Sequence, residues 1–193
     1  MDAIEVLKHD HRMVEQLFID YQATGGAGEG AASASAGARQ QRRGVVEVVI
    51  RELSKHAALE ELIFYPFAKK LLPDGEEEID RHLSEHMTVK RLLTDLDHLN
   101  EGDEEEEGLM AALEKETKEH IREEEEDLMV QVKDAADQEA LDDLGKLIDE
   151  GKSAAPTRAH PRAPDEPPAL ALAGPIASIY DRLRDRLQGR PQT

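Results

Sequence analysis

The chain has 193 residues, which is enough for one domain with a proper core plus linkers and a tail, and its formal net charge is −19. That charge opposes contact with DNA, RNA or an anionic membrane, so nucleic acid is not an expected partner. Cysteine is absent, which excludes disulfides, thiolate zinc sites and iron–sulfur clusters and leaves only nitrogen and oxygen ligands for any metal.

Four long amphipathic helices are predicted along the chain. The first begins after Asp2, as N-cap, and runs to about Thr24, because apolar residues recur at steps of three and four. The Gly-, Ser- and Ala-rich segment 25–38 is predicted as a flexible connection. The second helix is predicted over 39–72, with Pro66 kinking it or ending its regular part.

The third helix is predicted between the turn signals Pro73-Asp74-Gly75 and Asn100-Glu101-Gly102, and the fourth over about 104–136. Aromatic residues make up only 3% of the chain, which favours helices packed through aliphatic side chains. The predicted fold class is therefore all-α, an antiparallel up-down-up-down four-helix bundle.

The rest of the chain is predicted to be a tail on this bundle. A shorter helix over 138–150 completes a first unit of residues 1–150. Residues 151–174 read as a Pro-rich, disordered linker, and residues 175–193 as an amphipathic helix and tail. Residues 175–188 are a candidate contact for a protein partner or a second copy of the chain.

Each predicted helix places at least one potential metal ligand on its inward face. Residues four apart in a helix lie on the same side, so His-x-x-x-Glu and His-x-x-x-His pairs project together. Five histidines and two glutamates fall at such positions: His11, His56, Glu60, His82, His86, His120 and Glu124. So many polar groups are costly to desolvate in one core unless they coordinate a metal.

A count of bonds favours two metal ions. Five imidazoles, two carboxylates that each bridge both ions, and one oxo or hydroxo oxygen from solvent make about eleven of the twelve positions of two octahedral ions. The remaining position is open to a small ligand such as dioxygen.

Four segments together resemble the signature of the hemerythrin-like, cation-binding HHE family: DHRMVEQLF, HAALEELIFYP, HLSEHMTV and HIREEEEDLM. The resemblance covers about residues 3–135. It implies a non-haem di-iron centre whose ligands are His11, His56, Glu60, His86, His120 and Glu124. In the oxygen-carrying hemerythrins a histidine pair four apart supplies ligands from the third helix, which favours His82 as a seventh.

Two further choices arise from the same residues. In the oxygen carriers the helix-four acid follows its histidine by five residues, a spacing that selects Glu125. Glu124 fits the apolar stripe of this chain better, and the choice stays open within the acidic run 123–127. Phe64 and Tyr65 are interpreted as packing residues, not redox residues. The histidines at 9, 98 and 160 are expected to face solvent.

The resemblance leads to three hypotheses for function. The first is binding of dioxygen, nitric oxide or peroxide for storage, sensing or stress protection. The second is an enzyme that decomposes peroxide or repairs iron centres, and the third is an iron-responsive interaction module. No N-terminal stretch is apolar enough for a signal peptide or a membrane span, so a cytoplasmic protein without an integral membrane segment is expected.

Overall fold

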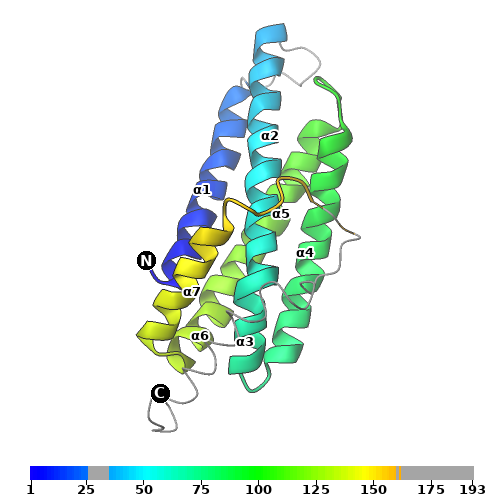
Figure 1. Cartoon of the computed structure of the whole chain (residues 1–193). Helices are drawn as coiled ribbons and strands as arrows, with labels where there is room; N and C mark the ends of the chain where they lie inside the picture. Colours follow the sequence, from blue (N-terminus) through cyan, green and yellow to red (C-terminus); the bar gives the residue numbers. More distant parts are fainter. Residues whose placement is uncertain (26–34, 160, 162–193) are drawn as a thin grey trace, which may run out of the picture.

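The computed structural model describes residues 1–25, 35–159 and 161, and within them every regular element is helical. Four long helices run side by side along the molecule (Figure 1). They are α1 (Ala3–Thr24), α2 (Ala36–Leu59), α4 (Gly75–His98) and α5 (Glu106–Glu123). The predicted all-α four-helix bundle is confirmed; the predicted helix after residue 175 lies outside the described residues.

The ends of the first two helices follow local capping chemistry. Asp2 caps α1 as predicted: its carboxylate accepts from the Glu5 N–H at 2.9 Å, and the Glu5 carboxylate accepts from the Asp2 N–H at 3.1 Å. Helix α2 begins at Ala36 instead of Arg39, because the Ser35 hydroxyl accepts from the Ala38 N–H and caps it earlier.

The predicted second and fourth helices each contain a π-helical turn. Turn η1 (Glu60–Phe64) joins α2 to α3 (Tyr65–Leu71), and turn η2 (Glu124–Leu128) joins α5 to α6 (Met129–Ala135). Pro66 is the second residue of α3, just beyond η1, so the interruption lies where the proline was predicted to kink the helix or end its regular part, since it has no N–H to give the helix. Helix four has no proline at the corresponding place, so its interruption was not predicted.

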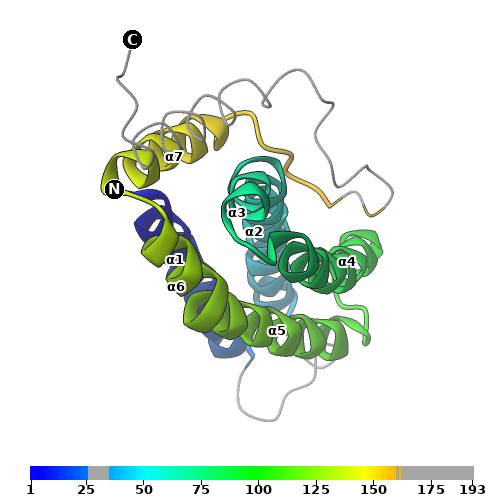
Figure 2. The ribbon, with the colours of Figure 1, turned by 90° about the horizontal axis from the view of Figure 1, so that it is seen from below.

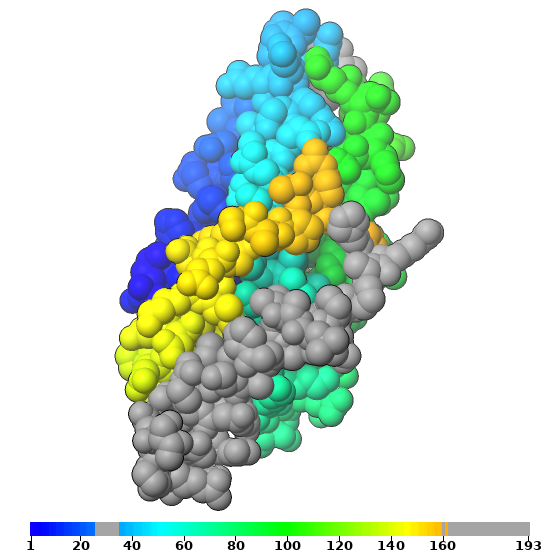
Figure 3. Space-filling view, in the orientation of Figure 1, coloured from blue at the N-terminus to red at the C-terminus, as the bar shows by residue number. Residues whose placement is uncertain are grey.

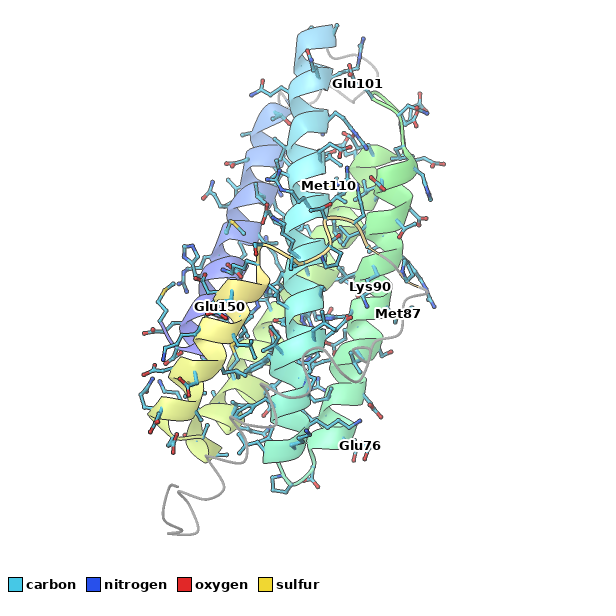
Figure 4. All side chains as sticks on the ribbon, in the orientation of Figure 1. Glu76, Met87, Lys90, Glu101, Met110 and Glu150 are labelled. Atoms are coloured by element: carbon cyan, nitrogen blue, oxygen red, sulfur yellow. The ribbon has the colours of Figure 1, made fainter. Side chains whose placement is uncertain are left out.

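The core consists of two apolar clusters, one toward each end of the bundle. One cluster includes Leu7, Ile63 and Leu128, and the other includes Phe18, Leu53 and Leu113. Figure 2 looks along the bundle, and in Figure 4 Glu76 and Glu101 mark its two ends. The predicted metal ligands lie in sequence between members of the two clusters on every helix, so they form a polar layer within an otherwise apolar interior.

Helix α7 (Gln138–Gly151) packs beside the beginning of α1 (Figures 1 and 3). A Cβ atom on Gly145 would lie 2.6 Å from the carbonyl oxygen of Met1, so glycine is needed for this close approach. Beyond α7, Arg158 pairs with Glu47 of α2 at 2.8 Å and with Asp97 of α4 at 2.9 Å. These contacts hold residues 152–159 against the bundle; the division of the chain at residue 150 stays a prediction.

Candidate metal centre

The seven predicted ligands all lie in the polar layer, and each is between 0% and 5% exposed. Both glutamates lie at the start of a π-helical turn. Glu60 is the first residue of η1 and Glu124 the first of η2, one turn after His56 and His120 respectively. Since π-turns concentrate at functional sites, their position at both glutamates marks this layer as the functional part of the bundle.

One group of ligand atoms comes from α1, α2 and the two π-turns. It contains His11, His56, Glu60 and Glu124, whose candidate atoms all lie within 4.8 Å of one another. The Nε2 atoms of His11 and His56 are 3.1 Å apart, and Glu60 Oε1 lies 3.0 Å from His56 Nε2. Glu124 Oε2 lies 3.2 Å from His11 Nε2. Four donors thus converge on one small volume.

The second group shares Glu60 with the first. It contains Glu60, His86 and His120, and the Nε2 atoms of the two histidines are 3.1 Å apart. Glu60 approaches His86 Nε2 with its other oxygen, Oε2, at 3.3 Å. One carboxylate therefore directs a different oxygen to each group, as a carboxylate that bridges two cations does.

The structure separates Glu124 from the rest of the acidic run. Glu124 is 0% exposed, and its Oε2 also approaches His120 Nε2 at 4.0 Å. The side chain of Glu125 is 28% exposed and turns to the other ring nitrogen of His11, Nδ1, at 2.8 Å. Glu124 faces the two groups and Glu125 stands behind one of their histidines.

His82 is buried but stands apart from Glu60. Its Nδ1 lies 3.2 Å from Glu85, and it forms a third group with Glu85 and His120. Its ring stacks on Tyr65, with centroids 5.9 Å apart. His82 thus borders the second group without joining it in this conformation.

The buried carboxylates fit a cation. No hydrogen bond reaches either oxygen of Glu60 or of Glu124 among the described residues, although imidazole nitrogens lie within ion-pair distance. Unpaired buried carboxylate oxygens are costly, and a metal ion removes that cost. Imidazole and carboxylate donors without thiolate suit iron or manganese, and also zinc or copper. The donor set therefore fits metal ions of this class.

Three of the histidines are held from behind by a second carboxylate, which was not predicted from the sequence. With Nε2 facing the centre, Nδ1 carries the proton and donates it. Each contact is 2.8 Å long, and the pairs are His11 with Glu125, His86 with Glu61, and His120 with Glu85. Lys90, labelled in Figure 4, donates to the other oxygen of Glu61 at 2.7 Å. The only sequence signal was an acid next to a candidate ligand, which is common in a chain this acidic.

These carboxylates control the charge of the metal-free centre. Burial alone lowers the pKa of His86, but the carboxylates of Glu60 and Glu61 beside its two ring nitrogens outweigh burial and raise that pKa to about 9. Burial also lowers the pKa of His11, but the carboxylates of Glu124, Glu125 and Glu60 outweigh burial and raise that pKa well above its usual value. Burial dominates at His120, and its pKa is lowered. Protons on His11 and His86 thus offset the buried carboxylates when no metal is bound.

Tyr65 belongs to the centre and not only to the packing around the kink. Its hydroxyl lies 3.1 Å from His86 Nε2 and 3.5 Å from His120 Nε2, and the residue is 1% exposed. Burial, together with nearby carboxylates of which Glu124 acts most strongly, raises the pKa of this phenol well above its usual value. The hydroxyl is therefore a protonated donor beside the second group. Phe64 packs in the apolar core, as predicted.

A small void adjoins the ligand groups. Its volume is about 10 Å³, room for roughly one water-sized molecule. Four histidines, His11, His56, His86 and His120, line it with apolar side chains and Thr117, whose buried hydroxyl has no hydrogen-bond partner among the described residues.

The histidines at 9 and 98 are exposed, as predicted, while His160 lies outside the described residues.

The fold and the centre together define a helical bundle with a buried histidine–carboxylate site for cations. The hemerythrin HHE cation binding domain model matches residues 2–132, and the chain belongs to this family. It is similar to an uncharacterised hemerythrin-like protein of Schizosaccharomyces pombe, with 31% identity over 142 residues, 72% of this chain and 70% of the relative.

Among solved structures, the chain resembles a hemerythrin HHE cation binding domain-containing protein from Mycobacterium kansasii. The TM-score is 0.63 with 19% identity, over 80% of this chain and 86% of that one, a likeness that shows the shared fold. In the described part of the chain, no helix combines the length and the apolar character that crossing a membrane requires.

Proposed function

We propose that this chain binds two iron ions and, through them, a small ligand such as dioxygen, nitric oxide or peroxide. The observation that carries the proposal is Glu60, which turns one oxygen to His11 and His56 and the other to His86. Its proposed role is the bridging carboxylate between the ions. The bound iron pair would supply reversible redox chemistry and a coordination position for the ligand.

The proposed ligand set is divided between the two groups. His11 and His56 would hold one ion, His86 and His120 would hold the other, and Glu60 and Glu124 would serve both. His82 is the proposed seventh ligand. Its Nδ1 contacts Glu85 at 3.2 Å, as Nδ1 of His120 does, so its buried Nε2, which has no hydrogen-bond partner among the described residues, would be the atom that binds the second ion.

The surroundings favour a small ligand. The void beside the centre holds roughly one water-sized molecule, so it excludes larger substrates. The hydroxyl of Thr117 can donate to a ligand there, since it has no partner among the described residues. The cytoplasm suits this role, because its reducing conditions keep iron in the form that takes up oxygen.

The test is to load the protein with ferrous iron without oxygen, count the iron and record absorption spectra. We expect two irons per chain and a spectral change when oxygen or nitric oxide is added. His86→Ala should lower the iron content, while His98→Ala, on the same helix but exposed, should leave it unchanged. A wild-type protein that binds no iron, or whose reduced form shows no spectral change with either gas, contradicts the proposal.

Peroxide decomposition is a second candidate, favoured by the position of Tyr65. Its protonated hydroxyl lies 3.1 Å from His86 Nε2, close enough to give a proton to peroxide at the second group. Two molecules of hydrogen peroxide then yield dioxygen and two of water. Oxygen evolution that is lost in Tyr65→Phe with iron retained supports this activity; equal evolution in both proteins argues against it.

A further inference from the structure

The two halves of the bundle repeat the same arrangement of acids and histidines. An acid precedes the histidine of one helix in each half, as Asp10-His11 in α1 and Glu85-His86 in α4. The partner helix carries a histidine and two glutamates, as His56, Glu60 and Glu61 in one half and His120, Glu124 and Glu125 in the other. Exchanging α1 with α4 and α2 with α5 therefore relates one half to the other.

The contacts behind the histidines obey this exchange. Glu61 accepts from His86 Nδ1 and Glu125 accepts from His11 Nδ1, and both contacts are 2.8 Å long. In the α4 and α5 half, Glu85 accepts from His120 Nδ1 at 2.8 Å. The exchange assigns the corresponding contact in the other half to Asp10 and His56.

That fourth contact is replaced by an ion pair with the segment after α7. His56 Nδ1 is buried and has no hydrogen-bond partner among the described residues. Asp10, itself only 6% exposed, instead receives a hydrogen bond from Lys152 Nζ at 2.9 Å. Asp10, His56 and Lys152 all line one cavity of about 230 Å³, between α1, α2 and the end of α7. Figure 3 shows residues 152–159, in orange, lying over this side of the bundle.

We propose that Asp10 is the positioning carboxylate of His56, reached through water in this cavity, and that Lys152 competes with His56 for it. The aspartate side chain is one methylene shorter than the glutamate that does this in the other half, and the cavity has room for the intervening water. The inference rests on the proposed function, because Nδ1 must carry a proton and needs an acceptor when Nε2 binds a metal. Through Asp10, Lys152 thereby connects the end of α7 to the strength with which His56 binds its ion.

The rate at which a chelator removes iron from the loaded protein tests this link. Loss of a carboxylate behind a metal-bound histidine weakens metal binding about 10–100-fold. Asp10→Ala should therefore release iron at least about 10-fold faster than wild type, with Asp10→Asn between them. Lys152→Met should slow release, because Asp10 then serves His56 alone. In the Asp10→Ala background, Lys152→Met should have no effect.

A signal from His56 itself separates positioning from mere packing. The solvent-exchangeable Nδ1 proton, shifted by the nearby iron in the NMR spectrum, should move in Asp10→Ala and in Lys152→Met. The control is Lys146→Met, which removes an exposed lysine from α7 that pairs with Asp143 and does not line the cavity. It should leave both the signal and the release rate unchanged.

The outcomes distinguish this inference from the proposed function. A wild-type protein that binds no iron overturns both. A wild type that binds iron, but whose Asp10→Ala variant releases it at the wild-type rate with the Nδ1 signal unmoved, overturns the inference alone. A Lys152→Met effect that persists without Asp10 overturns the competition.

Discussion

Raising the pH should destabilise the metal-free protein through His86. Its pKa is about 9 in the fold against 6.5 in the unfolded chain, because the carboxylates of Glu60 and Glu61 favour its charged form over the cost of burial. The stabilisation from its proton is fully present below about pH 6.5 and is lost as the pH rises through about 9.

This difference in pKa corresponds to roughly 3 kcal/mol of unfolding free energy at full effect. For a chain of this size, that energy lowers the unfolding temperature by roughly 6–12 °C. Thermal unfolding of metal-free protein, followed by circular dichroism between pH 6 and pH 10, measures the loss.

The general increase in negative charge with pH also destabilises the fold, so a matched variant is needed. His86→Asn removes the titrating group, and its stability should fall less over the same pH range, by about the 3 kcal/mol assigned to His86. The iron-loaded protein should also lack this component, because Nε2 of His86 is then bound. An equal pH dependence in wild type and His86→Asn would refute the reasoning.

Three further predictions concern the two glutamates and the packing. Glu124→Gln should bring the iron content below two per chain. Glu125→Gln should keep two irons but release them to a chelator at least about 10-fold faster, because Glu125 contacts Nδ1 of the proposed ligand His11. Leu113→Ala should lower the unfolding free energy of the metal-free protein by about 2–5 kcal/mol in urea titrations, since Leu113 is 0% exposed, and a loss under 1 kcal/mol would contradict its place in the core. Gly145→Val should cost about 1–3 kcal/mol in the same assay by forcing α7 from α1, and an unchanged midpoint would show that this contact is dispensable.

Helical periodicity was sufficient to place the candidate ligands. The spacing of His56 and Glu60, and of His120 and Glu124, fixed which side chains share a face, and the structure buries all four together. The same stripe favoured Glu124 over Glu125 before any tertiary contact was known. This preference for Glu124 agrees with its burial, although ligand binding by either residue stays a prediction.

Features that depend on tertiary contacts were missed. The π-turn at Glu124 carries no proline or glycine, and its only signal is a change in helical register that the acidic run conceals. Tyr65 was interpreted as packing because Pro66 offered a local explanation, while its contact with His120 joins residues far apart in sequence. Glu85 was passed over because one more acid on a charged helix is ordinary.

The central claim is that one carboxylate, Glu60, joins two irons in a single centre. Electron paramagnetic resonance of oxidised protein loaded with two irons per chain tests it most directly. Two ferric ions in one bridged centre couple their spins, so the wild type should give almost no signal, and a Glu60→Ala/Glu124→Ala variant, which lacks both carboxylates proposed to contact the two irons, should give the signal of isolated high-spin ferric iron. A wild-type protein with a strong isolated ferric signal would contradict the account.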